Sequence, residues 1–276
     1  MNTESPDSSQ QNEPWWPVVV PFVIFMIVTA MEPKLGDTFN NWADLSEGAG
    51  QADGEQGQVA EEESTIGGWA WNNPASRYFV IYSVKIILIA VIVIYCFPFY
   101  LRHFPCKLSW WGIIVGVVGA VLWIGLCQLQ LERAIATTLG LPETWFAQRA
   151  AANPGLHFQS LMPIGLFFLV RFFGLVIVVP LIEELFLRGF FIRYIEDVEW
   201  WKAKFDQLGW LPLLMPSIYG VLAHPMSEAF AAATWFGLVT WLMVRTRSLW
   251  DCIMAHAITN LMLGLYVVRY EQWHLW

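Results

Sequence analysis

Apolar residues gather into long runs along this chain, separated by shorter polar stretches. A helix that crosses a bilayer needs about 20 predominantly apolar residues, so these runs predict an all-α fold, a polytopic membrane helical bundle of about seven or eight transmembrane helices. The runs lie at Trp15–Met31, Tyr78–Tyr100, Trp110–Leu129, Met162–Ile182 with a continuation through Glu183–Ile195, Leu211–Ala223, Ala229–Val244 and Ile253–Val268.

Prolines interrupt the apolar runs of the second half of the chain. Pro180 lies just before two glutamates, and Pro225 lies just after His224. Proline removes a backbone donor and kinks or ends a helix, so we predict kinked or broken central helices. Broken helices at membrane depth are tolerated where they are buried in protein or line a cavity. A polar cavity in this half of the chain follows as a hypothesis.

The composition agrees with a membrane protein, because 57% of the residues are hydrophobic and only 14% are charged, against about 25% charged in soluble domains. The net charge of −8 comes largely from the parts outside the apolar runs, so it does not indicate a nucleic-acid partner. We interpret residues 1–276 as a single membrane domain, multi-pass in a cell membrane.

One sizeable polar connection, residues 32–77, carries nine acidic and two basic residues. We predict that it is a disordered loop. Basic residues cluster in two other connections, at Arg102, Lys107, Arg193, Lys202 and Lys204. The positive-inside rule predicts that these two connections are cytoplasmic, which leaves the acidic loop extracytoplasmic.

Ionisable residues directly follow one apolar run, at Glu183, Glu184 and Arg188. Such groups are costly at membrane depth, so they indicate a functional site. Helical neighbours lie about 100° apart, so the two glutamates cannot face the same way. Glu184 and Arg188 are four residues apart and can pair, which leaves Glu183 available for proton transfer. The alternative is a solvated charged cluster at a helix end on the membrane surface.

Two histidines and an asparagine follow in later apolar segments. The proline after His224 disfavours helical conformation there, so this imidazole is expected at a helix end, either aimed into a cavity or as an ordinary turn residue. His256 and Asn260 are four apart and share one helix face. Their N–H groups could hold a developing oxyanion. The alternative is interhelical hydrogen bonding between buried polar groups.

Four further residues have simpler interpretations. Arg171 is expected to neutralise a neighbour or to mark a substrate path, and Glu228 to begin a helix, where a carboxylate suits the dipole. Gly112 and Gly116 form a small-residue spacing that predicts close helix packing.

These motifs, in this order, resemble those of one family. Glu-Glu-x-x-x-Arg at 183–188, a histidine closing a short apolar segment at 224 and His-x-x-x-Asn at 256–260 are similar to the CPBP family, the CAAX protease and bacteriocin-processing (Abi, or type II CAAX prenyl endopeptidase) membrane proteins. The resemblance covers about residues 160–270, and it implies that these are the catalytic core helices and that the membrane is a bacterial inner membrane. The family's second motif has phenylalanine four residues before the histidine, whereas this chain has Gly220, so Tyr219 is expected to take over the aromatic role.

The resemblance implies a glutamic-type intramembrane endopeptidase with a cavity that opens to the cytoplasmic side. It implies that Glu183 activates water together with His224. His256 and Asn260 would then form the oxyanion hole. Glu184 and Arg188 would orient the side chains of the site and neutralise its charge.

A peptide or membrane-protein substrate and the lipid bilayer are the expected partners, and no cofactor is expected. Two carboxylates and two imidazoles could bind zinc in principle, but the chain lacks HExxH spacing and a glutamate-activated water needs no metal, so the metal-free interpretation is favoured. The rival function is a non-catalytic membrane scaffold or bacteriocin-immunity-type protein that binds a peptide in the same cavity.

Overall fold

The computed structural model describes residues 13–32, 74–148, 153 and 161–275, and this part of the chain is helical without any strand. The longer helices are α1 (Trp16–Met31), α3 (Pro74–His103), α4 (Trp110–Leu129), α9 (Trp210–Ala223), α10 (Ala229–Thr246) and α11 (Leu249–Tyr270). The predicted all-helical bundle is confirmed. Most of the predicted loop at 32–77 lies outside the described residues.

Residues 161–196 form one continuous helical run rather than two separate helices. It consists of α6 (Leu161–Phe173), a π turn η5 (Gly174–Val178), α7 (Val179–Glu184), a second π turn η6 (Leu185–Phe191) and α8 (Ile192–Glu196). The predicted interruption at Pro180 therefore takes the form of two widened turns. Short π segments inside α-helices are frequent at functional sites.

Short helices occupy the connections. They are α5 (Leu131–Leu139), η3 (Glu143–Phe146), η7 (Met226–Glu228) and η8 (Trp273–Leu275). The sequence patterns did not predict α5, which begins directly after α4 at Gln130, a residue in the left-handed conformation.

Five of the described helices are long and apolar enough to cross a membrane, which marks the chain as a multi-pass membrane protein. Two shorter apolar helices, α1 and α9, accompany them. On α3 the exposed apolar residues recur every three or four positions, at Val84, Ile87, Val91 and Ile94. This spacing gives a stripe on one side of the helix, as expected for a surface that faces lipid.

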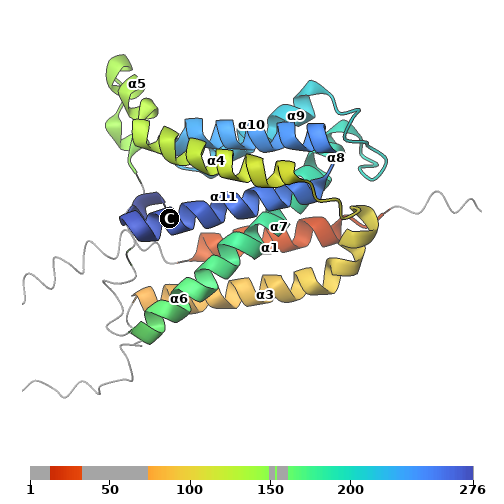
Figure 1. Cartoon of the computed structure of the whole chain (residues 1–276), viewed down its shortest axis with the longest axis horizontal. Helices are drawn as coiled ribbons and strands as arrows, with labels where there is room; N and C mark the ends of the chain where they lie inside the picture. Colours follow the sequence, from red (N-terminus) through yellow and green to blue (C-terminus); the bar gives the residue numbers. More distant parts are fainter. Residues whose placement is uncertain (1–12, 33–73, 149–152, 154–160, 276) are drawn as a thin grey trace, which may run out of the picture.

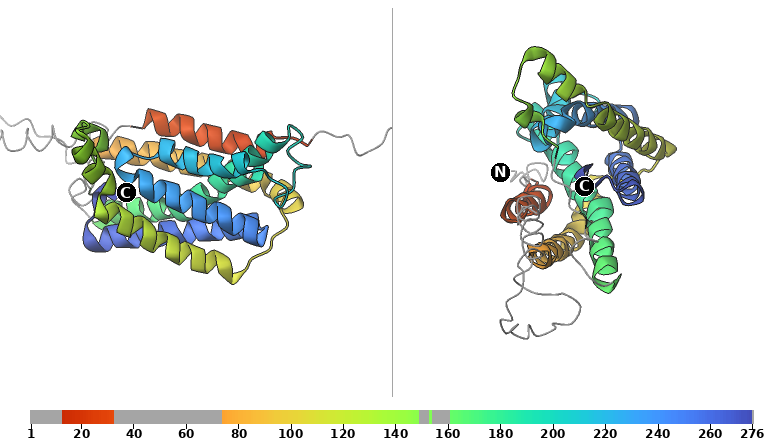
Figure 2. Two further views of the ribbon diagram at one scale, coloured as in Figure 1. Left: turned by 90° about the horizontal axis from the view of Figure 1, so that it is seen from above. Right: turned by 90° about the vertical axis from the view of Figure 1, so that its left-hand side faces the viewer.

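The helices form two packed groups that share the central run (Figures 1 and 2). One core lies among α4, α10 and α11, and the other among α1, α3 and α7. Because successive helices alternate in direction, the connections collect at the two ends of the bundle (Figure 1). One end carries the α3–α4, α8–α9 and α10–α11 connections, and the other carries α5 and the C-terminus.

Glycines allow α4 to approach α11 closely, as the small-residue spacing predicts. A Cβ atom on Gly116 would lie 2.7 Å from Ile258 Cβ and 2.9 Å from the Ala255 carbonyl oxygen. A hydrogen bond also joins the two helices at this point, because the Thr259 hydroxyl donates to the Gly116 carbonyl at 2.9 Å. This contact fixes the height and rotation of α11, the helix that carries His256.

Gly116→Val is expected to destabilise the protein by about 1–3 kcal/mol, because the added atoms overlap α11 backbone and a β-branched side chain. The matched control is Gly125→Val on the same helix, where no atom lies within 4 Å of an added Cβ. The midpoint of unfolding in an SDS titration of mixed micelles measures both variants. Equal midpoints for the two variants would show that the close approach of α4 to α11 at Gly116 does not contribute to stability.

Candidate active site

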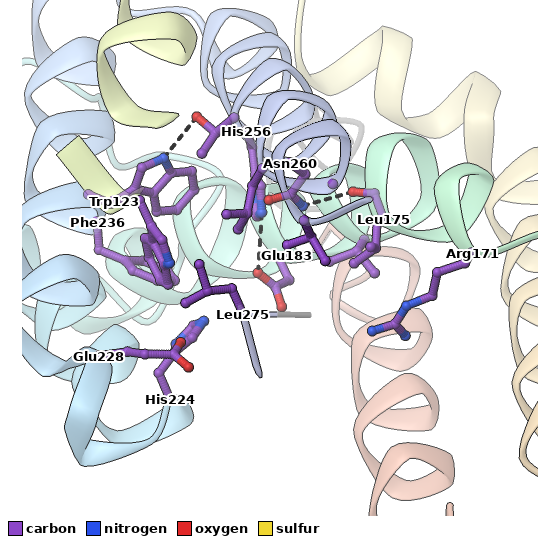
Figure 3. A pocket seen from close by; sticks show the side chains of 16 residues that line it. Trp123, Arg171, Leu175, Glu183, His224, Glu228, Phe236, His256, Asn260 and Leu275 are labelled. Atoms are coloured by element: carbon purple, nitrogen blue, oxygen red, sulfur yellow. Dashed lines mark hydrogen bonds and ion pairs between the residues drawn. The ribbon is translucent and has the colours of Figure 1, made fainter. Parts of the chain in front are cut away.

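A cavity of about 170 Å³ lies among α4, the central run, α10 and α11 (Figure 3). Four of the six site residues predicted from the sequence line it, namely Glu183, His224, His256 and Asn260. The other two, Glu184 and Arg188, are completely buried beside it. The remaining lining residues are Trp123, Arg171, Leu175, Val179, Glu228, Trp235, Phe236, Thr259, Leu263, Gly264, Val267 and Leu275.

The two adjacent glutamates at the end of α7 have different surroundings. Glu183 faces the cavity, with 15% of its side chain exposed, whereas Glu184 is fully buried. This difference follows from the rotation of about 100° between helical neighbours. Glu183 is therefore the carboxylate that a bound water or substrate can reach.

Glu184 is held by two partners. One oxygen accepts a hydrogen bond from Arg188 at 2.5 Å, which is the pairing predicted from their spacing. The guanidinium also donates to the Phe236 carbonyl at 3.0 Å and lies 3.4 Å from the Thr240 hydroxyl. Additional hydrogen bonds of this kind make a buried ion pair tolerable. They engage the two terminal nitrogens of the guanidinium, whereas its buried Nε has no hydrogen-bond partner among the described residues.

The second oxygen of Glu184 holds His256, a contact that the sequence did not predict. His256 Nδ1 lies 3.0 Å from Glu184 Oε1, so the ring donates to the carboxylate there. Its other nitrogen, Nε2, faces the cavity and lies 3.9 Å from Glu183 Oε2. The Trp235 indole packs edge-on against the imidazole, with 4.6 Å between ring centroids. The ring orientation is thus fixed on three sides.

Asn260 lies one turn after His256 and lines the same cavity, as the four-residue spacing predicts. Its amide nitrogen donates to the Leu175 carbonyl in η5 at 2.8 Å. A carboxamide carries two N–H donors, so one remains for a group in the cavity. The hydrogen bond joins α11 to the π turn and so couples the two elements that carry the site.

His224 closes α9 with extended backbone, as expected for a residue before proline (φ −114°, ψ 159°). Its Nδ1 lies 2.9 Å from the Gly220 carbonyl oxygen. A carbonyl can only accept a hydrogen bond, so Nδ1 carries the proton. In the neutral ring the lone pair is then on Nε2, where His224 can act as a base.

The aromatic residues around His224 come from neighbouring helices. Trp123 and Phe236 pack edge-on against the imidazole, with centroid distances of 5.1 and 5.9 Å. Gly220 allows this arrangement, because a Cβ atom there would lie 2.3 Å from Phe236 Cδ2. The ring of Phe236 thus occupies the space beside position 220, where the family's motif has its own phenylalanine. Tyr219, for which the aromatic role was expected, packs against Phe236 instead.

Gly220→Ala is expected to destabilise the protein by about 1–3 kcal/mol, because Phe236 is buried and has no room to move away. Gly237→Ala on α10 is the control, since its nearest contact is an ordinary 3.4 Å from the Ser217 hydroxyl. Thermal unfolding in detergent compares them. Restoration of stability by Phe236→Leu in the Gly220→Ala background would identify the ring as the cause, and no restoration would contradict this explanation.

Two charged cavity residues received other interpretations from the sequence. Glu228 directly precedes α10, as expected, and it is also buried and lines the cavity. Its position four residues after His224 was the sequence signal that could have predicted its place in the cavity. Arg171 lines the cavity as well and donates to the Tyr78 hydroxyl at 2.9 Å. Trp123 and Leu275 are far away in sequence, and no local pattern marks them as cavity residues.

Zinc does not suit this donor set. Within the described ranges, no group of three or more His, Cys, Asp or Glu side chains could hold a metal ion. Both oxygens of Glu184 are engaged, one by Arg188 and the other by His256. Structural zinc sites use four protein ligands and catalytic zinc sites use three.

Comparison with known proteins identifies one family over the segment that carries these residues. Residues 165–262 match the family model described as type II CAAX prenyl endopeptidase Rce1-like. The matched segment spans about a third of the chain and contains all six predicted site residues. No curated protein and no solved structure matches the chain. The family match confirms the resemblance identified from the motifs and supports a protease of the CAAX type embedded in the membrane.

Proposed function

We propose that this chain, which carries an Rce1-like type II CAAX prenyl endopeptidase domain, is a glutamic-type intramembrane endopeptidase of a bacterial inner membrane. It hydrolyses a peptide bond of a membrane-associated peptide or membrane protein. The supporting observation is the division of labour between the two glutamates. Glu184 is neutralised and orients His256, while its neighbour Glu183 faces the cavity with a carboxylate that can accept a proton.

In the proposed reaction, Glu183 takes a proton from a water molecule as the water oxygen attacks the scissile carbonyl carbon. His224 directs its Nε2 lone pair at the same water. The tetrahedral intermediate then collapses, the C–N bond breaks, and the proton held by Glu183 passes to the leaving amine. No covalent bond forms between substrate and protein.

Negative charge on the scissile carbonyl oxygen is stabilised from the α11 side of the cavity. The second amide N–H of Asn260 is one donor. When the His256 ring is protonated, Glu184 holds its Nδ1–H, and its Nε2–H is the second donor. Fixed donors of this kind stabilise an oxyanion strongly in a site that excludes water, because they need no reorganisation.

The rival function, peptide binding without cleavage by a scaffold or immunity-type protein, predicts a different phenotype. Membrane proteomes of cells that contain the wild-type protein, the Glu183→Gln variant or no protein distinguish the two. The endopeptidase proposal predicts a longer precursor that accumulates both without the protein and with Glu183→Gln. A binder predicts that Glu183→Gln cells resemble the wild type.

Chelation tests the metal-free mechanism. Purified full-length protein is expected to retain its cleavage rate in detergent after prolonged treatment with a zinc chelator. Loss of the rate and its recovery on addition of zinc would establish a metal site and overturn this part of the proposal.

A further inference from the structure

A second cavity, separate from the candidate active site, lies where α5 meets the start of α10. Its volume is about 310 Å³, and none of its lining residues lines the active-site cavity. Most of the lining is polar and comes from α5, η3, η7 and the residues that flank them: Gln130, Glu132, Arg133, Thr144, Phe146, Ala147, Gln148 and Ser227.

Glu132 is the carboxylate of this cavity, and only 5% of the residue is exposed. One oxygen, Oε1, accepts a hydrogen bond at 2.8 Å from the backbone N–H of Phe230 in the first turn of α10. The other oxygen, Oε2, is buried as well, and no described residue donates to it. A buried carboxylate oxygen without a donor is costly. Oε2 therefore indicates a ligand that brings a positively charged hydrogen-bond donor into the cavity.

Arg133 follows Glu132 directly and lines the same cavity, so the lining carries both signs of charge. The guanidinium disfavours a bare metal cation, and it is a preferred partner of phosphate, which it can bind through two parallel hydrogen bonds. A simple anion would meet the Glu132 carboxylate. The two charges together suit a ligand with an ammonium and a phosphate group a few bonds apart. Amide and hydroxyl groups of the lining can satisfy further phosphate oxygens, namely those of Gln130, Thr144, Gln148 and Ser227.

The cavity lies at the level expected for the bilayer surface. α4 has 20 residues, which is the length that crosses the hydrocarbon core, and α5 begins directly after it. The left-handed conformation of Gln130 turns the chain there, so α5 leaves the direction of α4 (Figure 1). The indole of Trp145 in η3 is exposed at 62%, as is typical of aromatic rings at the headgroup level.

α5 has the amphipathic character of a helix that lies in the membrane interface. Leu131, Ile135 and Leu139 recur every four residues and are exposed on one side of it, whereas Glu132 and Ala136 form its buried side. Such an exposed apolar side faces acyl chains, and the polar side faces headgroups. Glu132 thus lies at the boundary between an acyl-chain surface and a charged cavity, where the headgroup of a bound lipid is expected.

We propose that this cavity binds the headgroup of an aminophospholipid of the phosphatidylethanolamine class. The primary ammonium donates to Glu132 Oε2, the phosphate accepts from Arg133, and the acyl chains lie along the exposed apolar side of α5. Only η7 separates this lipid from the candidate active site, because Ser227 lines the headgroup cavity and the next residue, Glu228, lines the other cavity. The lipid therefore joins α5 to the start of α10 beside the active site.

Lipid binding by the purified full-length protein tests the proposal without any need for cleavage. The protein is delipidated in detergent and mixed with equal amounts of phosphatidylethanolamine, phosphatidylcholine and phosphatidylglycerol that have the same acyl chains. Native mass spectrometry then measures which lipid is retained. Phosphatidylethanolamine is expected to be retained preferentially, because phosphatidylcholine has a quaternary ammonium without N–H donors and phosphatidylglycerol has no ammonium.

Two variants assign the headgroup to its partners. Glu132→Gln keeps the shape and the acceptor for the Phe230 N–H, but it removes the charge that holds the ammonium. Retention of phosphatidylethanolamine should fall at least about tenfold, the usual effect of losing a hydrogen bond to a charged group. Arg133→Gln changes an exposed residue and should weaken retention through the phosphate. The matched control is Glu196→Gln, since the exposed Glu196 carboxylate also accepts from a backbone N–H, that of Gly209 at 2.7 Å, and lines neither cavity.

Retention by Glu196→Gln should equal that of the wild type, and the SDS-titration midpoint verifies that each variant is folded. Equal retention of the three lipids by the wild type, or of none, would overturn the proposal. Unchanged retention of phosphatidylethanolamine by Arg133→Gln and by a folded Glu132→Gln protein would do the same. If Glu132→Gln failed to fold, the wild-type lipid preference and Arg133→Gln would still decide.

Glycerophosphoethanolamine, the same headgroup without acyl chains, distinguishes a lipid site from a site for a soluble ligand. It should displace phosphatidylethanolamine only at much higher concentration, because it lacks the contact with the apolar side of α5. Equal potency would contradict a lipid site. Displacement of the lipid by the precursor peptide at equal concentration would indicate a substrate subsite instead. None of these results depends on whether Glu183→Gln abolishes cleavage.

Discussion

Replacement of Glu183 by glutamine is expected to reduce the cleavage rate by about 10²–10⁴-fold, the usual contribution of a general base. Glutamine has nearly the same shape, and it cannot accept the proton of the attacking water. The variant should fold normally, because the Glu183 side chain is partly exposed to the cavity and the adjacent Glu184–Arg188 pair is untouched. The rate is measured with purified full-length protein and the precursor that accumulates in Glu183→Gln cells.

Glu199→Gln is the matched control for this prediction. Glu199 lies in the α8–α9 connection, where its carboxylate pairs with Lys202 and both side chains are about half exposed. Its replacement should leave both the rate and the unfolding midpoint unchanged. A Glu183→Gln protein with the wild-type rate would remove the base from the mechanism.

Removal of one partner from the Glu184–Arg188 pair is expected to have the largest effect on stability. Arg188→Met leaves Glu184 as a buried charge with only His256 beside it, and such a change costs about 3–5 kcal/mol. The SDS-titration midpoint measures this loss. The half-exposed Glu199–Lys202 pair is the comparison, where Lys202→Ala should cost no more than about 1 kcal/mol.

The double variant Glu184→Leu/Arg188→Met separates stability from orientation. Replacing both charges by apolar side chains should recover much of the lost stability, because no buried charge remains uncompensated. Cleavage should stay low, because His256 Nδ1 has then lost the carboxylate that fixes its ring. Full recovery of cleavage with stability would show that Glu184 has no positioning role.

The helices and the residue types of the site were predictable from local pattern. Apolar runs of spanning length predicted the helical bundle. Spacings of four residues predicted the Glu184–Arg188 pair and the shared helix face of His256 and Asn260. The proline after His224 correctly predicted that α9 ends there. Each of these features depends on residues that are close in sequence, so helix geometry alone determines them.

Contacts between distant segments could not be predicted in the same way. The Glu184–His256 hydrogen bond joins residues 72 positions apart, and the Asn260–Leu175 bond depends on a π turn without a local sequence signature. Phe236 replaces an aromatic residue of α9 because α9 and α10 pack at Gly220. Such features depend on how the helices pack against one another. The periodicity of apolar residues in a single sequence does not specify that packing.

The oxygen that enters the product tests the mechanism most directly. Purified wild-type protein cleaves the precursor in H₂¹⁸O under single-turnover conditions, and mass spectrometry reads the new C-terminal carboxylate. Direct attack by a water that Glu183 activates predicts one ¹⁸O atom in that carboxylate on the first turnover. A first-turnover product without ¹⁸O, with the label instead in the side chain of Glu183, would show an acyl-enzyme and contradict the account.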